Sequence, residues 1–254
     1  MPAHRTIRVE AADGVATLTL NRPEVRNAID LEMVRELTVA LHELAADASL
    51  RVVILRGEGG TFAGGADIGE LRERRSPEAL RAINATLFQQ LEDLPLPTIA
   101  VIRGFALGGG AELALACDLR IAAATAKLGF PEVSLGIFPA AGGTHRLPRL
   151  VGLGRAKELV FTGRILGAQE ALELGLVERV VPEAELDDAA LALAKEIAAN
   201  APLAVRIAKL SFNAVASGSD PAPLEQLGQA LLFDSQDKLD RMAAFLARKR
   251  RKEK

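Results

Sequence analysis

The feature that most constrains this chain is an apolar strand followed at once by a glycine-rich loop and a helix start. The strand is predicted over residues 98–102, which are apolar and mostly β-branched, as in a strand covered on both faces. The loop holds Gly108, Gly109 and Gly110, whose missing Cβ atoms let backbone N–H groups approach a ligand closely. A helix beginning near Gly109 directs its free N–H groups and its positive dipole end into the same space.

Glu112 lies in the first turn of this predicted helix, within reach of whatever the N–H groups hold. Backbone donors for an oxygen and a carboxylate for a proton are what acid–base chemistry beside a carbonyl requires. For a single glycine-rich loop, a plain tight turn is an equally simple alternative. A dinucleotide cradle is disfavoured, because that motif belongs near the first strand of its fold.

The composition is that of a folded protein, with 49% hydrophobic and 25% charged residues in a chain of 254. A formal net charge of -2 and a pI near 6.0 do not call for a nucleic acid or an anionic membrane. The single cysteine, Cys117, excludes an internal disulfide and is expected to be a small buried hydrophobe. Neither a membrane-spanning run nor a signal-peptide core is evident, so a cytoplasmic protein is expected.

Strand and helix signals alternate through the first part of the chain. Two alternating segments, 6–10 and 15–20, flank a turn signal and predict a hairpin. Asp30 is expected to cap the helix that follows it. A cap, a proline and an early acid at 76–78 predict one helix running to about Leu91.

The pattern changes near residue 195 from mixed strand and helix to helix alone. The remainder of the chain is expected to form three further helices. We therefore predict an α/β core over residues 1–195, which contains the site, and a helical region over 196–254.

Four segments in order resemble the crotonase family, the enoyl-CoA hydratase/isomerase superfamily. Each is modest evidence alone, whereas four in register across most of the chain are specific. They occupy residues 21–28, 62–68, 104–112 and 130–144 and read NRPEVRNA, FAGGADI, GFALGGGAE and FPEVSLGIFPAAGGT. The resemblance implies a spiral of strand–strand–helix turns and a C-terminal helical trimerisation region. It also implies a homo-oligomer, either a trimer or a dimer of trimers.

The resemblance also implies site residues. The backbone N–H groups of Ala66 and Gly109 correspond to an oxyanion hole, and each lies where a loop enters a predicted helix. Glu112 and Glu132 correspond to the two catalytic glutamates of the family. Two carboxylates in one partly dry pocket resist joint ionisation, so one is expected to keep a proton.

An acyl-CoA substrate is implied as well, with CoA contacts from a small set of residues and with no metal or redox cofactor. The three histidines, His4, His42 and His145, are scattered, and a surface position is expected for the last of them. The residues matched to CoA contacts are Arg26, Ala28, Ala66, Asp67, Ile68 and Gly109.

The presence of both glutamates makes enoyl-CoA hydratase the preferred function, with Glu112 activating water and Glu132 holding it and protonating Cα. The alternatives are another acyl-CoA enzyme of the family, such as an enoyl-CoA isomerase or a methylglutaconyl-CoA-type hydratase, or a non-catalytic CoA- or RNA-binding protein. Two positions depart from the family pattern. Phe130 replaces a polar residue found in some hydratases, and Gly69 replaces a lysine found in many.

Overall fold

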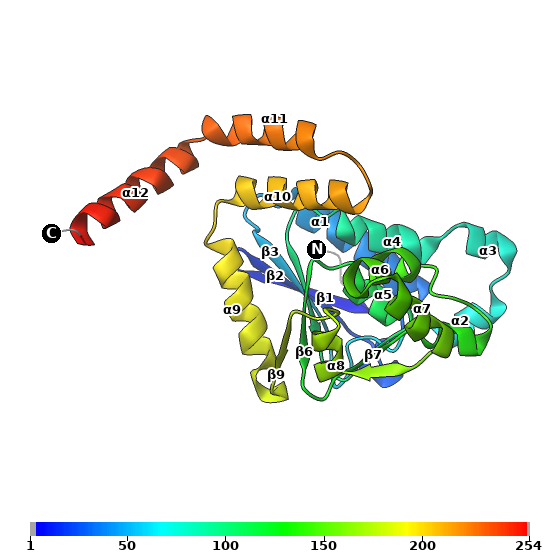
Figure 1. Ribbon diagram of the computed structural model, residues 1–254. Helices are drawn as coiled ribbons and strands as arrows, with labels where there is room; N and C mark the ends of the chain where they lie inside the picture. The colour runs from blue at the N-terminus through cyan, green and yellow to red at the C-terminus, as the bar shows by residue number, and fades with distance from the viewer. Residues whose placement is uncertain (1–3, 253–254) are drawn as a thin grey trace. The chain divides into compact units, whose positions relative to one another are not determined.

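A six-stranded sheet forms the centre of the first of two compact units, Met1–Ile197 (Figure 1). The computed structural model describes residues 4–252, with side chains up to residue 249. Strands β1 and β2 pair antiparallel, and each later pairing in the sheet order is parallel. That order is β1 (Ile7–Ala12), β2 (Val15–Leu20), β3 (Val52–Gly57), β4 (Thr98–Ile102), β6 (Leu119–Ala123) and β9 (Arg179–Val181).

The predicted central strand and hairpin are confirmed. Every residue of β4 is buried, as expected of a strand with sheet neighbours on both sides and both faces covered. The hairpin turns at Asp13 and Gly14, which both have positive φ angles, 52° and 77°. Positive φ at both central residues is the two-residue turn whose twist matches that of the flanking strands.

A second sheet consists of three short strands, and its first strand forms a bridge with the segment before Gly64. It contains β5 (Phe105–Leu107), β7 (Lys127–Gly129) and β8 (Ile165–Gly167) in that order. Strand β4 is followed directly by β5 and then by α5 (Gly109–Leu115), and β6 is followed by β7 and the short helix η2 (Pro131–Leu135). The predicted α/β class with strand–strand–helix turns is therefore confirmed.

Several helices of this unit begin at a capping side chain or a glycine. Asp30 caps α1 (Leu31–Ala46) as predicted, since its Oδ1 accepts the N–H of Met33 at 2.8 Å. The others are η1 (Pro23–Val25), α2 (Ile68–Glu73), α6 (Gly143–Val151), α7 (Leu153–Thr162), α8 (Ala168–Glu173), η3 (Glu183–Glu185) and α9 (Leu186–Ala198).

The single helix predicted from residue 76 to about Leu91 is wrong. The chain forms α3 (Ser76–Leu80) and α4 (Ile83–Glu92), separated by Ala82, whose φ of 48° is left-handed. The two helices differ in burial: α4 packs on α1 and buries Leu87, Phe88 and Leu91, whereas α3 buries no residue. Packing therefore fixes the direction of α4, and the exposed turn before it follows a different path.

The second compact unit, Ala198–Lys254, is helical throughout its described residues. It contains α10 (Pro202–Ala216), α11 (Ala222–Phe233) and α12 (Gln236–Lys252), the three helices expected from the sequence. Helix α11 packs on α10 at Gly228, where an added Cβ would lie 2.5 Å from Cγ2 of Ile207. The chain divides between residues 197 and 198.

Candidate active site

The backbone N–H groups of Ala66 and Gly109 come from separate loops and lie beside each other. A Cβ built on Gly109 would lie 3.4 Å from the N of Ala66. A Cβ built on Gly65, whose φ is +118°, would lie 3.1 Å from the carbonyl O of Leu107. The two loops meet backbone to backbone, and the positive φ and close carbonyl at Gly65 favour glycine at that position.

Backbone pairing leaves the Ala66 N–H pointing away from its neighbouring strand. Ile29 donates its N–H to the carbonyl O of Gly65 at 2.8 Å, and Ile29 O accepts the N–H of Asp67 at 3.0 Å. Because the peptide group is planar and trans, fixing the Gly65 carbonyl directs the Ala66 N–H to the opposite side. Within residues 4–252, no backbone carbonyl accepts the N–H of Ala66.

Gly109 is the first residue of α5, so its N–H has no partner inside the helix. The preceding residue, Gly108, has a φ of 51° and donates its own N–H to the carbonyl O of Gly129 at 2.9 Å. That bond ties the loop to β7 and orients the start of α5. The dipole of this buried helix adds partial positive charge at the same point.

Glu112 projects from the first turn of α5 and is 4% exposed. One carboxylate oxygen, Oε1, accepts the N–H groups of Ala141 and Gly143, both at 2.8 Å. The pKa of Glu112 is raised to about 7, chiefly by burial and also by the charge of Glu132, against the lowering effect of the two N–H groups and of Arg146. At neutral pH this carboxyl can both accept and release a proton.

Glu132 is the one buried residue of η2, at 8% exposed. Neither of its side-chain oxygens has a hydrogen-bond partner among the described residues. Burial raises the pKa of Glu132 above its usual range. A carboxyl with two buried, unused oxygens is suited to a group that binds there only during function.

The structure places Glu132 against the glycine loop from which the helix of Glu112 begins. A Cβ built on Gly108 would lie 3.2 Å from Oε1 of Glu132, while Gly108 O accepts the N–H of Glu112 at 2.9 Å. The charge of Glu132 acts on the pKa of Glu112, so the two carboxyls share one electrostatic environment. The sequence-predicted pair and Gly109 are thus adjacent, and Ala66 joins them through its contact with Gly109.

The loop that holds Glu112 is braced by Arg146, which sequence reasoning did not single out. Arg146 is 4% exposed and donates to the carbonyl O of Ala141 at 3.1 Å. The guanidinium also binds Oε2 of Glu92 through Nη2 at 2.6 Å and Nε at 2.9 Å. A buried arginine that binds one carboxylate oxygen through two of its nitrogens is a rigid anchor. An arginine three residues after Gly143 was the only local signal for it.

Five of the six residues matched to CoA contacts lie in the two segments that the Ile29–Ala66 pairing joins, and the sixth is Gly109. Arg26 is exposed and has a left-handed φ of 57°. Ala28 uses its carbonyl O to accept from Arg22 at 2.7 Å. Asp67 donates its N–H to Ile29, so that N–H is already committed, and Ile68 is 56% exposed.

The structure shows what surrounds Phe130 and Gly69, the two positions that depart from the family pattern. Phe130 is 1% exposed at the start of η2, where its ring is part of the core directly before Glu132. Gly69 follows the cap of α2, and a Cβ there would lie 3.2 Å from Oδ1 of Asp67. His145 lies exposed on α6, as expected from the sequence. Among the described residues, no three His, Cys, Asp or Glu side chains form a group that could hold a metal ion.

Comparison with known proteins gives a consistent set of relatives. The sequence model of the family described as enoyl-CoA hydratase/isomerase matches residues 10–252. The chain is 40% identical to the short-chain-enoyl-CoA hydratase of Clostridium acetobutylicum, with 95% of each chain covered. It is 39% identical to the crotonyl-CoA hydratase of Syntrophomonas wolfei, covering 98% of this chain and 97% of that one. The crystal structure of enoyl-CoA hydratase from Bacillus anthracis matches with a TM-score of 0.92 and 42% identity, covering 96% of this chain and 97% of that chain.

Proposed function

Because this chain belongs to the enoyl-CoA hydratase/isomerase family, we propose that it adds water reversibly to a 2-enoyl-CoA thioester. The product is a 3-hydroxyacyl-CoA, so the protein acts as an enoyl-CoA hydratase. The observation that carries this proposal is the pair of buried carboxyls, Glu112 and Glu132, beside the Gly108–Gly109 backbone and close enough for the charge of one to act on the other. CoA enters as part of the substrate, and the reaction as proposed uses no further cofactor.

In the proposed reaction the thioester oxygen lies between the N–H groups of Ala66 and Gly109. This oxygen gains negative charge as water adds to Cβ and the electrons of the double bond move toward the carbonyl. Donors already fixed in a water-poor site stabilise that charge without reorganising. Loss of one such donor is expected to slow turnover by roughly 10²- to 10³-fold.

Protons are moved by the two glutamates. Glu112, with one oxygen held by Ala141 and Gly143, is placed to take a proton from the attacking water through its other oxygen. Glu132 has both oxygens available to hold the same water and to deliver a proton to Cα. The hydroxyl adds to Cβ and the proton of Glu132 to Cα, and the proton that Glu112 takes from water replaces the one lost by Glu132 before the next turnover, so each turnover consumes one water and restores both carboxyls. Each role is worth about 10² to 10⁴ in rate.

A panel of acyl-CoA thioesters followed by mass spectrometry tests this proposal against the other family chemistries. Hydration raises the product mass by one water, whereas moving the double bond leaves the mass unchanged. Crotonyl-CoA is expected to gain water and to lose its enoyl-thioester absorbance. Isomerised products without water gain, or tight acyl-CoA binding without turnover, would overturn the hydratase assignment.

Helices α10, α11 and α12 suggest that the partner of this chain is another copy of itself. We infer that it mediates assembly into a trimer or dimer of trimers, because large apolar side chains are exposed on all three of its helices. They are Leu203, Leu210, Phe212, Val215, Leu227, Leu231, Phe233, Leu239, Met242, Phe245 and Leu246. No helix of the described chain is long and apolar enough to cross a membrane. A cytoplasmic location is part of this proposal, and fractionation of the source cells tests it.

A further inference from the structure

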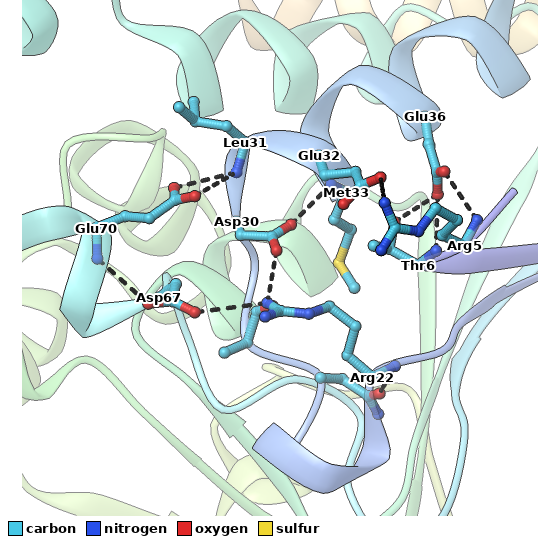
Figure 2. A network of polar contacts seen from close by, with 12 residues as sticks. Arg5, Thr6, Arg22, Asp30, Leu31, Glu32, Met33, Glu36, Asp67 and Glu70 are labelled. Carbon is cyan, nitrogen blue, oxygen red and sulfur yellow. Dashed lines mark hydrogen bonds and ion pairs between the residues drawn. The ribbon is translucent and has the colours of Figure 1, made fainter.

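The side chain of Arg22 joins the two segments on either side of the Ile29–Ala66 pairing (Figure 2). A single nitrogen, Nη1, lies 2.7 Å from the carbonyl O of Ala28, 3.0 Å from Oδ2 of Asp30 and 3.5 Å from Oδ2 of Asp67. Arg22 lies two residues after the end of β2, so the contact is anchored close to the central sheet. Its side chain is 18% exposed, which limits screening of these charges by solvent.

Each of the two carboxylates that bind Arg22 also caps a helix. Asp30 uses Oδ1 to accept the N–H of Met33 in α1 at 2.8 Å. Asp67 uses Oδ1 in the same way for the N–H of Glu70 in α2, at 3.2 Å. In both side chains, one oxygen therefore fixes a helix N-terminus and the other binds Arg22.

A second contact also joins the N-termini of α1 and α2. Glu70, in the first turn of α2, accepts the N–H of Leu31, the first residue of α1, at 3.1 and 3.3 Å (Figure 2). Arg74 also binds Oε2 of this carboxylate at 3.2 Å. The N-termini of α1 and α2 are thus tied through Arg22 on one side and through Glu70 on the other.

The pairing that orients the Ala66 N–H lies between these links. Ile29 is adjacent to Asp30, and Ala66 is adjacent to Asp67, so each carboxylate adjoins one member of the pair. Removing the positive charge of Arg22 leaves two carboxylates facing one another without a cation between them. Their repulsion separates the same two segments whose contact fixes the Gly65–Ala66 peptide plane.

We propose that Arg22 is a positioning residue, which holds the Ala66 N–H at the thioester oxygen by acting through Asp30 and Asp67. This inference rests on the proposed function, because it presupposes a thioester between Ala66 and Gly109. Arg22 itself need not contact the reacting atoms, since the three contacts of Nη1 are all to protein oxygens.

The test uses the full chain and 2,4-hexadienoyl-CoA, a conjugated thioester whose ultraviolet band moves to longer wavelength as its carbonyl oxygen gains negative charge. The wild-type protein is expected to shift this band on binding. Arg22→Gln is expected to lose about half of the shift or more, and to lower kcat for crotonyl-CoA by about 10- to 10³-fold. Arg22→Lys is expected to recover most of both, because one nitrogen makes all three contacts. Arg35→Gln removes an exposed arginine of α1 and serves as the control with a full shift.

A full band shift in folded Arg22→Gln would overturn the proposal, and so would a lower kcat with the shift unchanged. If Arg22→Gln does not fold, Asp30→Asn is used instead, because it keeps a cap for Met33 while removing the ion pair through which Arg22 holds this segment, and it is expected to lose part of the shift. An unchanged shift in that variant would equally overturn the proposal. A wild-type protein that neither shifts the band nor hydrates crotonyl-CoA would instead overturn the proposed function, and this inference with it.

Discussion

Replacing Glu112 by glutamine is expected to stabilise the fold while removing activity. The carboxyl is 4% exposed, and burial is the main cause that raises its pKa from 4.5 to about 7. A shift of that size corresponds to about 3 kcal/mol of penalty on the charged form in the folded protein. Glutamine is nearly isosteric with the protonated acid and keeps an oxygen for the N–H groups of Ala141 and Gly143.

The direction of the pH dependence follows from whether Glu112 loses its proton first in the folded or in the unfolded chain. Below pH 4.5 the Glu112 carboxyl is protonated in the folded and unfolded chains alike, and the penalty is absent. Between pH 4.5 and about 7 the unfolded chain ionises first, so stability of the wild type falls as pH rises. Above about 7 both states are ionised and the full penalty remains. The stability advantage of Glu112→Gln should thus be about 1 kcal/mol at pH 5 and about 3 kcal/mol at pH 8.

Thermal unfolding at the two pH values measures this difference. For a chain of this length, a gain of about 2 kcal/mol between pH 5 and pH 8 widens the gap in Tm by about 4–8 °C. Turnover of crotonyl-CoA is measured on the same samples and is expected to fall at least about a hundredfold. Glu10→Gln, at an exposed position of strand β1, is the control without a widening gap. A Tm gap that stays constant or narrows with rising pH would refute the reasoning.

Three further predictions follow from contacts in the structure. Gly109→Ala places a Cβ 3.4 Å from the N of Ala66, in the space between the two donors. It should lower kcat by roughly 10²-fold in the crotonyl-CoA assay. An unchanged kcat would contradict the proposed position of the thioester oxygen. Glu92→Ala leaves the buried guanidinium of Arg146 without its carboxylate. It should lower the free energy of unfolding, measured in urea, by about 3–5 kcal/mol. A loss under about 1 kcal/mol would show that this ion pair is not a rigid anchor. Phe245→Glu places a charge on the exposed apolar face of α12 and should shift the mass measured by light scattering toward the monomer, while an unchanged mass would exclude this face from the assembly.

Local signals predicted those parts of the fold that neighbouring residues determine. The side chain of Asp30 caps the helix that begins one residue later, and Asp13 and Gly14 form the turn between adjacent strands. The break at Ala82 was missed, because its cause is the packing of α4 on α1, whose residues are distant in sequence. Alanine carries no turn signal, so only the tertiary contact makes its left-handed φ necessary.

The candidate site shows the same difference between local sequence signals and contacts of residues distant in sequence. The glycines and the two glutamates lie in recognisable motifs, and the structure brings Glu112, Glu132 and Gly109 together. Their roles remain predictions. The supporting contacts were not predictable, because Arg146 meets Glu92 across 54 positions and Arg22 meets Asp67 across the strand and helix between them. A lone arginine in a sequence is usually a surface charge, and only burial distinguishes an anchor from it.

Turnover of crotonyl-CoA in H₂¹⁸O by the wild type, Glu112→Gln and Glu132→Gln tests the central claim most directly. The wild type should place the label at C3 of the product, and each variant should do so at least about a hundredfold more slowly while retaining affinity for CoA. Labelling at the wild-type rate in both variants would contradict the assignment of proton transfer to these two carboxyls.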